Sequence, residues 1–291
     1  TCSCFRNNNK IKYKNMNKDT KKLPIYKFFN SSKKYSIKWS SYFQVYEKIF
    51  SSYRNKKIKF VEIGVANGGS LFMWKNYFGK KAKIIGIDLN PKAKNLEKYG
   101  FKIYTGSQSD KNFWKKFYKK EGKIDLILDD GGHKNLQQIS TVHFSLAHVN
   151  DGGKIVIEDT STSYLKKEFN NPSKYSFISF AKNIVDIIHY RSPLLGKNLN
   201  LYAKKIHLVE FFESITVFSI DSKKCWMNQE ISNKAKNEWA ADFRYNEYFG
   251  QIKNKLNKKY GRLNKRSFLR KLIRKLFYRN FIFNIFDNIK I

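Results

Sequence analysis

The chain has 291 residues, of which 41% are hydrophobic, so it is long enough to bury a sizeable core, and wholesale disorder is not expected. Lys and Arg total 58 against 23 Asp and Glu, which gives a formal net charge of +35 and favours an anionic partner. Lys and Asn are also abundant in stretches without other pattern, such as residues 7–18, so a general drift in residue usage accounts for most of this excess.

Cysteine content and hydrophobic runs bear on the compartment. The three cysteines, Cys2, Cys4 and Cys225, are too few for a disulfide framework and lack zinc-ligand spacing, which predicts a reducing compartment, the cytoplasm. No run of 18 apolar residues occurs, and the first residues lack the apolar region of a signal peptide. We therefore expect neither a membrane span nor secretion.

The N-terminal part is expected to precede the main domain. Residues 1–35 are polar and rich in Lys and Asn, and we interpret them as a polar tail. A helix is predicted over residues 39–50, where aromatic and aliphatic residues recur at helical spacing. Packing in a core, or in a lid on the substrate side, explains this apolar face better than an aromatic binding platform does.

A regular alternation of apolar runs and helical patterns begins at residue 58. Strands are predicted at 58–65, 82–89, 101–105, 123–130 and 152–159, with helices at 69–78, 91–98, 110–120 and 134–149 between them. A further helix is expected over 175–190, and residues 206–220 read as a closing hairpin. This order predicts an α/β domain over 36–225, a Rossmann-like, mostly parallel sheet of seven strands flanked by helices.

Residues 226–291 form a predicted basic helical extension. Between 251 and 286 the apolar residues recur on one helix face, and Lys and Arg surround them. Such a helix packs on the domain, packs on a second subunit in a homo-oligomer, or rests on an anionic membrane surface, which would make the protein peripheral at the membrane. These alternatives stay open at this point.

A glycine-rich turn follows the first strand. In EIGVANGGS (62–70), Gly64, Gly68 and Gly69 let the backbone turn tightly beside a ligand. Asp88 ends the next strand, where a carboxylate accepts hydrogen bonds from ribose hydroxyls in nucleotide-binding sheets. Because Ala66 replaces the middle glycine of a dinucleotide fingerprint, an adenosine-containing cofactor without a pyrophosphate fits this pattern better.

The scarce acidic residues gather at strand ends. Asp130 and His133 follow the strand 123–130, and Glu158 and Asp159 end the strand 152–159. Ligands bind at the carboxyl ends of parallel strands, so the three carboxylates together predict a site for a hard divalent cation, Mg²⁺, with His133 as a base. Taken singly, each residue also has a structural interpretation: the histidine as a capping or hydrogen-bonded loop residue, and the carboxylates as helix N-caps. Their grouping at one edge favours the metal site over these interpretations.

Five segments together resemble the class I S-adenosylmethionine-dependent methyltransferases: FVEIGVANGGSLFMW (60–74), IIGIDLNP (84–91), GSQSD (106–110), LILDDGGH (126–133) and GGKIVIEDTSTSY (152–164). More narrowly, they resemble the metal-dependent sugar O-methyltransferases that act on macrolide-linked deoxysugars, with relatives in bacterial glycan clusters. The resemblance covers about residues 39–220. It implies a methyl transfer to a sugar hydroxyl of a glycan or a glycosylated metabolite, with S-adenosylmethionine and Mg²⁺ as cofactors.

The resemblance also implies roles for single residues. The residues expected beside the cofactor are Glu62, Gly64 and Gly68 at its methionine part, Asp88 at its ribose, and Ser107 and Gln108 near its adenine. Asp130, Glu158 and Asp159 would bind Mg²⁺, and His133 would be the general base. One departure is Gly132, where the family commonly has Ser.

Two other functions would also use features of this sequence. A methyltransferase acting on RNA or another polyanion would use the +35 charge, but the acidic rim would repel a phosphate backbone, so nucleic acid is not the expected partner. A non-catalytic subunit that binds membranes through the basic C-terminal helix is the alternative from another class. Turnover in the presence of the cofactor separates it from an enzyme.

Overall fold

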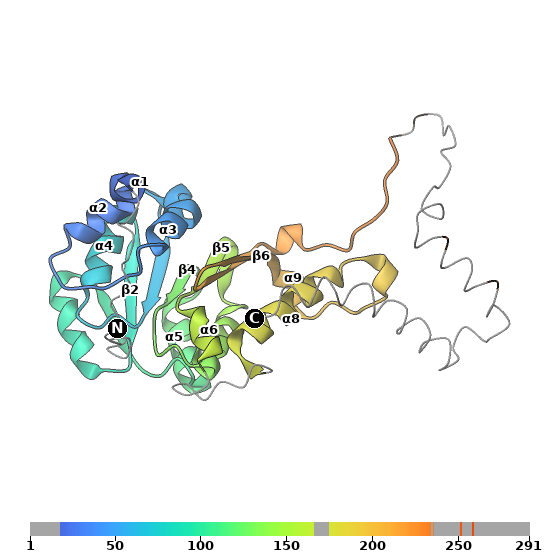
Figure 1. The fold of residues 1–291 in the computed structure, drawn as a ribbon. Coiled ribbons are helices and arrows are strands. Elements are labelled where there is room, and N and C mark those ends of the chain that lie inside the picture. Colours follow the sequence, from blue (N-terminus) through green and yellow to red (C-terminus); the bar gives the residue numbers. More distant parts are fainter. Residues whose placement is uncertain (1–17, 166–174, 234, 236–250, 252–257, 259–291) are drawn as a thin grey trace. The chain divides into compact units, whose positions relative to one another are not determined.

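The structure is a computed structural model, and it describes residues 18–165, 175–233, 235, 251 and 258 (Figure 1). Within these residues one sheet has the strands β1 (Lys59–Ile63), β2 (Lys83–Asp88), β3 (Lys102–Thr105), β4 (Ile124–Asp129), β5 (Val149–Ile157), β6 (Ile206–Phe212) and β7 (Ile215–Ile220). The helices are α1 (Lys18–Lys22), α2 (Pro24–Asn30), α3 (Tyr42–Phe50), α4 (Gly69–Phe78), α5 (Lys111–Glu121), α6 (Asn135–Ser145), α8 (Phe177–His189) and α9 (Leu201–Lys205).

The strand order confirms the predicted sheet. The order is β3-β2-β1-β4-β5-β7-β6, and β1 to β5 pair in parallel, whereas β7 pairs antiparallel with β5 and β6. Each short crossover helix returns the chain to the same end of the sheet, which is why the parallel strands all point one way. The strands that follow β1 are first added on one side of it (β2, β3) and then on the other (β4, β5), so the order reverses between β1 and β4. The ends of the strands on either side of this switch point open a crevice.

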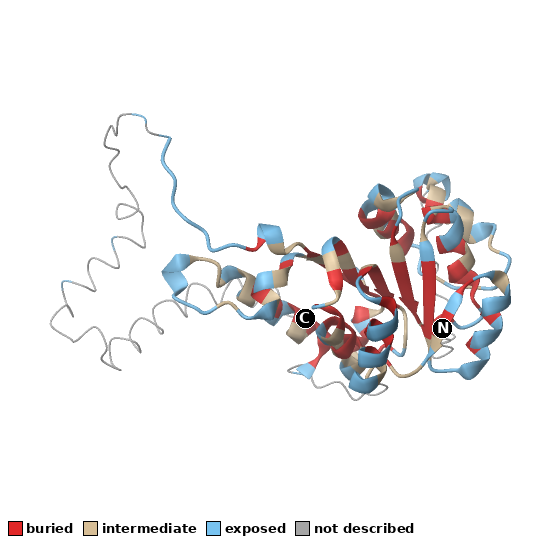
Figure 2. Ribbon diagram, turned by 180° about the vertical axis from the view of Figure 1, so that it is seen from behind, coloured by how far each residue is buried: buried red, intermediate tan, exposed pale blue. Residues whose placement is uncertain are grey.

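Two apolar layers cover the sheet, because alternate strand residues point to opposite faces. Phe60 packs in one layer with residues of α3 and α4, and its neighbour Val61 packs in the other with residues of α5, α6 and α8. The central strands are buried almost throughout (Figure 2). Burial on both faces explains why these strands read as continuous apolar runs.

The N-terminal residues differ from the predicted polar tail. Residues 18–30 form α1 and α2, and Ile25 is fully buried against the aromatic layer that contains α3 and α4. Ring contacts join Tyr26 and Phe29 of α2 to Phe43 of α3. The apolar residues between 23 and 29 are too few for a clear helical period, and their burial against the domain stabilises these short helices.

Other elements complete the comparison with the sequence. Residues Pro91–Tyr99 (η3) form 3₁₀ turns in place of the predicted α-helix, and α3 begins at Tyr42, so Trp39 precedes it. Most of the predicted basic helix over 251–286 lies outside the described residues, as do all of residues 1–17 and 166–174. Among the helices that are described, none has the length and apolar character needed to cross a membrane.

Candidate active site

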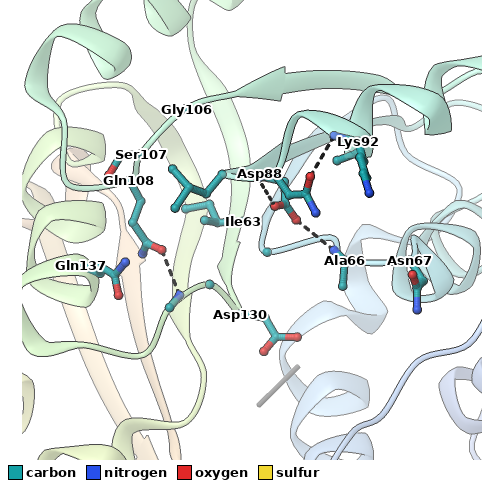
Figure 3. A pocket seen from close by; sticks show the side chains of 16 residues that line it. Ile63, Ala66, Asn67, Asp88, Lys92, Gly106, Ser107, Gln108, Asp130 and Gln137 are labelled. Atoms are coloured by element: carbon teal, nitrogen blue, oxygen red, sulfur yellow. Dashed lines mark hydrogen bonds between the residues drawn. The ribbon is translucent and has the colours of Figure 1, made fainter. Parts of the chain in front are cut away.

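A cavity of about 510 Å³ opens at the carboxyl ends of β1, β2 and β4 (Figure 3). Of the residues predicted for the cofactor, Gly64, Asp88, Ser107 and Gln108 line it, together with Asp130. Glu62 and Gly68 are not among its lining residues. The crevice predicted from the strand order is therefore present, and it joins the predicted cofactor residues to one predicted metal ligand.

Gly64 fits this position because its backbone has φ of +85° and lies against the next loop. A Cβ atom at Gly64 would lie 2.0 Å from the carbonyl oxygen of Asp130, which no side chain could tolerate. Gly68 has φ of +83° and precedes α4 as its N-cap residue. Both glycines shape the turn between β1 and α4, Gly64 beside the cavity and Gly68 at the start of the helix.

Asp88 fixes the same turn from the end of β2. Its Oδ2 atom accepts hydrogen bonds from the backbone N–H groups of Val65 and Ala66, both at 3.0 Å, and its Oδ1 atom accepts one from Asn90 at 2.8 Å. A carboxylate has about four acceptor positions, so Oδ1 retains one for a ligand hydroxyl. Asp88 thus positions the glycine-rich turn while it faces the cavity.

Glu62 directly precedes the cavity-lining residues Ile63 and Gly64 and is 0% exposed. Its carboxylate accepts hydrogen bonds from Ser70 Oγ at 2.8 Å and from Trp74 Nε1 at 3.1 Å. Burial raises the pKa of Glu62 to about 7, although Lys38 and these two hydrogen bonds act in the opposite direction. The carboxyl group therefore holds its proton to a higher pH than an exposed glutamate does.

Gln108 braces the loop after β4. Its Nε2 atom donates to Asp129 Oδ2 at 2.7 Å, and its Oε1 atom accepts from the backbone N–H of Gly132 at 3.2 Å. Asp129 Oδ1 also accepts from the N–H of Gly131 at 3.0 Å. These bonds hold the turn that carries His133. At Gly132 in this turn, a Cβ atom would lie 2.2 Å from Oε1 of Gln137, so a larger residue would require the Gln137 side chain to move.

Asp130, His133 and Asp159 form the carboxylate–histidine cluster. One ligand atom from each lies within 4.8 Å of the others, a grouping that could hold a metal ion. His133 Nε2 lies 3.5 Å from Asp159 Oδ2 and 4.0 Å from Asp130 Oδ1, and its side chain is 5% exposed. The ends of β4 and β5 therefore bring these side chains together.

The backbone at two of these residues adopts an uncommon conformation. His133 has φ of +55° and Asp159 has φ of +52°, a left-handed conformation that non-glycine residues rarely adopt. At Asp159, at the end of β5, this conformation breaks the strand alternation that would otherwise point adjacent side chains to opposite faces. Such strain concentrates at functional sites, where surrounding contacts maintain it.

Lys38 connects Glu158 to the carboxylate–histidine cluster by contacting both Glu158 and Asp130. Lys38 Nζ donates to Asp130 Oδ2 at 2.6 Å and to Glu158 Oε2 at 2.8 Å, and Tyr46 OH donates to Glu158 Oε1. Burial raises the pKa of Glu158 well above its ordinary value. Burial alone would lower the pKa of Lys38, but the charges of Asp130 and Glu158 outweigh it and keep this pKa above its ordinary value.

The segment before and within α3 supplies polar groups that the sequence did not assign to the site. Tyr42 OH donates to Asp159 Oδ1 at 2.6 Å, and Trp39 Nε1 donates to the same atom at 3.1 Å. Lys38, Tyr42 and Tyr46 are spaced four residues apart, and each ends in a polar atom. That spacing is the signal the sequence offers, but it equally fits a helix face packed in a core or in a lid on the substrate side, which is how the sequence was interpreted.

Comparison with known sequences gives named relatives, whereas no family model matches the chain. The chain is 31% identical over 169 residues to the 8-demethyl-8-alpha-L-rhamnosyl tetracenomycin-C 2'-O-methyltransferase of Streptomyces olivaceus, covering 53% of this chain and 43% of the relative. It is 33% identical over 126 residues to the mycinamicin VI 2''-O-methyltransferase of Micromonospora griseorubida, covering 41% and 31%. The chain thus spans less than half the length of these curated relatives.

Solved structures agree on the fold. The methyltransferase MycE of the mycinamycin pathway, in complex with Mg, SAH and mycinamycin VI, superposes with a TM-score of 0.62 at 21% identity over 80% of this chain and 58% of that one. Another crystal form, in complex with Mg and SAH, gives a TM-score of 0.60 at 22% identity over 73% and 58%. The chain therefore has the Rossmann-like fold of the class I methyltransferases, and over part of its length its sequence is similar to the two named O-methyltransferases.

Proposed function

We propose that the protein transfers a methyl group from S-adenosylmethionine to a sugar hydroxyl. One observation carries this proposal: Asp130 lines the cavity and also belongs to the carboxylate–histidine cluster. A methyl donor in the cavity and an acceptor held at the cluster would therefore meet at one residue. Positioning the two reactants side by side supplies much of the catalysis in such a transfer.

The cavity suits an adenosine cofactor without phosphate groups. Asp88 offers an acceptor for ribose hydroxyls, and Ser107 and Gln108 line the wall where the adenine is expected. Gly64 lets the backbone approach the ligand without a side chain in the way. S-adenosylmethionine carries its methyl group on a positively charged sulfur, which makes that group readily transferable to a nucleophile.

The cluster suits a hard divalent cation. Asp130, Asp159 and Glu158 would hold Mg²⁺ through carboxylate oxygens, the ligands that this ion prefers. Bound Mg²⁺ would lower the pKa of an acceptor hydroxyl. His133 Nε2, which lies near the carboxylates of Asp130 and Asp159, would take the proton from the hydroxyl as general base. Asp159 would in addition orient the imidazole ring.

The names of the relatives support a sugar acceptor, because they describe 2'- and 2''-O-methylation of glycosylated natural products. The concentration of acidic side chains at the cluster makes a phosphate backbone a poor acceptor. A cytoplasmic location and a contact of residues 251–286 with an anionic membrane surface stay predictions from the sequence, as does a homo-oligomer.

The proposal is tested with the purified full chain, S-adenosylmethionine and Mg²⁺. Free, nucleotide-linked and lipid-linked sugars serve as acceptors, and mass spectrometry detects a product heavier by one methylene. We expect the product to form, to disappear in excess EDTA and to return when Mg²⁺ is restored. Unchanged turnover in EDTA would refute the metal, and comparing glycans from hosts with and without the gene identifies the natural acceptor.

A further inference from the structure

Lys38 places a positive charge inside the acidic site. It lies in the irregular stretch 35–39 between α2 and α3, where its neighbours Ile37 and Trp39 are 56% and 51% exposed. The side chain of Lys38 is only 1% exposed and makes ion pairs with Asp130 and Glu158. The stretch therefore directs one cation into the cluster, whereas Ile37 is exposed and the half-exposed Trp39 reaches the cluster only through its Nε1 atom.

The contacts of Lys38 use oxygen atoms that a metal would need. Its Nζ atom lies 2.6 Å from Asp130 Oδ2 and 2.8 Å from Glu158 Oε2, so it bridges two carboxylates that come from different strand ends. Mg²⁺ binds carboxylate oxygens at about 2.0–2.1 Å, and a buried ammonium so close to it would be strongly repelled. An ion held by both of these oxygens would have to replace the ammonium group.

Resting on the proposed function, we propose that Lys38 is a tethered cation that exchanges with the divalent metal at Asp130 and Glu158. In the absence of metal, Lys38 neutralises carboxylates that would otherwise repel one another in a buried site. When the metal binds, the ammonium leaves and the stretch 35–39 shifts with it. Trp39 moves as part of the same stretch, so the exchange also alters its hydrogen bond to Asp159.

A different mode of metal binding would leave Lys38 in place. His133 Nε2 lies near Asp130 Oδ1 and Asp159 Oδ2, whereas Lys38 contacts the other carboxylate oxygen of Asp130, Oδ2. A metal held by these atoms alone would not compete with the ammonium group for an oxygen atom. The two modes predict different effects of removing the charge of Lys38, so a binding measurement separates them.

The experiment titrates Mn²⁺ into the full chain and follows free Mn²⁺ by electron paramagnetic resonance. Lys38→Met removes the charge but keeps an apolar stem. Lys33→Met is the control, because Lys33 is an exposed lysine that also lies between α2 and α3. We expect Lys38→Met to bind Mn²⁺ at least about tenfold more tightly than the wild type, because no tethered cation competes. Lys33→Met should bind like the wild type.

Lysine footprinting of the wild type tests the same exchange without a variant. A lysine-acetylating reagent and peptide mass spectrometry should find Lys38 protected without metal and modified in saturating Mn²⁺, with Lys33 modified in both conditions. Mn²⁺ binding that is equal or weaker in Lys38→Met, or Lys38 that stays protected with metal bound, overturns the exchange and leaves the metal site standing. No Mn²⁺ binding by any form overturns both the exchange and the proposed metal.

Discussion

Glu62 should make the stability of the protein depend on pH in a predictable direction. In the folded state burial raises its pKa to about 7, compared with an ordinary value of 4.5. Between these values the unfolded chain has lost the proton while the folded chain still holds it. Folding is therefore favoured below pH 4.5, and this contribution is lost as the pH rises toward 7.

The size of this change in stability follows from the pKa shift of Glu62. Each pH unit in this window changes the free energy of unfolding by about 1.4 kcal/mol, so the whole window is worth about 3 kcal/mol. Glu62→Gln keeps the shape of the side chain but cannot titrate. Its altered hydrogen bonds to Ser70 and Trp74 change the stability by an amount that does not depend on pH.

Urea unfolding of the wild type and of Glu62→Gln between pH 4.5 and pH 8 measures the difference. We expect the variant to gain about 3 kcal/mol relative to the wild type from the acid to the neutral end. Glu213→Gln, at an exposed position, is the control and should change little. A difference between wild type and Glu62→Gln that stays constant over this range would refute the reasoning, because it would show that Glu62 ionises normally in the folded state.

Three further predictions concern the proposed cofactor and metal. Asp88→Asn should weaken S-adenosylmethionine binding by about tenfold or more in calorimetric titration, since a charged acceptor of backbone N–H groups is lost. The control Asp110→Asn, which alters the N-cap of α5, should bind S-adenosylmethionine like the wild type. His133→Ala should slow methyl transfer by roughly 10²–10⁴-fold while cofactor and Mn²⁺ still bind, and a near-normal rate would return this histidine to a structural role. Asp159→Asn keeps an oxygen for Tyr42 but should lose Mn²⁺ binding and turnover together; retained Mn²⁺ affinity would exclude Asp159 as a ligand.

The sheet, most of its crossover helices and the location of the candidate site were predictable from the sequence, because each depends on local pattern. Apolar runs of strand length alternate with helical periods, and this order makes a parallel sheet. The carboxyl ends of parallel strands meet at one edge, so Asp88, Asp130 and Asp159 could be expected near one crevice before any contact was known. A glycine-rich turn such as the one at Gly64 has the same local character.

The tertiary structure decided which groups meet inside that crevice. Lys38 reaches Asp130 and Glu158 across 92 and 120 residues of the chain, and no local period reports such a contact. The raised pKa of Glu62 arises from the packing around it, and the burial of α2 arises from the aromatic layer that covers it. Local patterns specify backbone elements, whereas the environment of a side chain depends on segments that only the packed fold brings together.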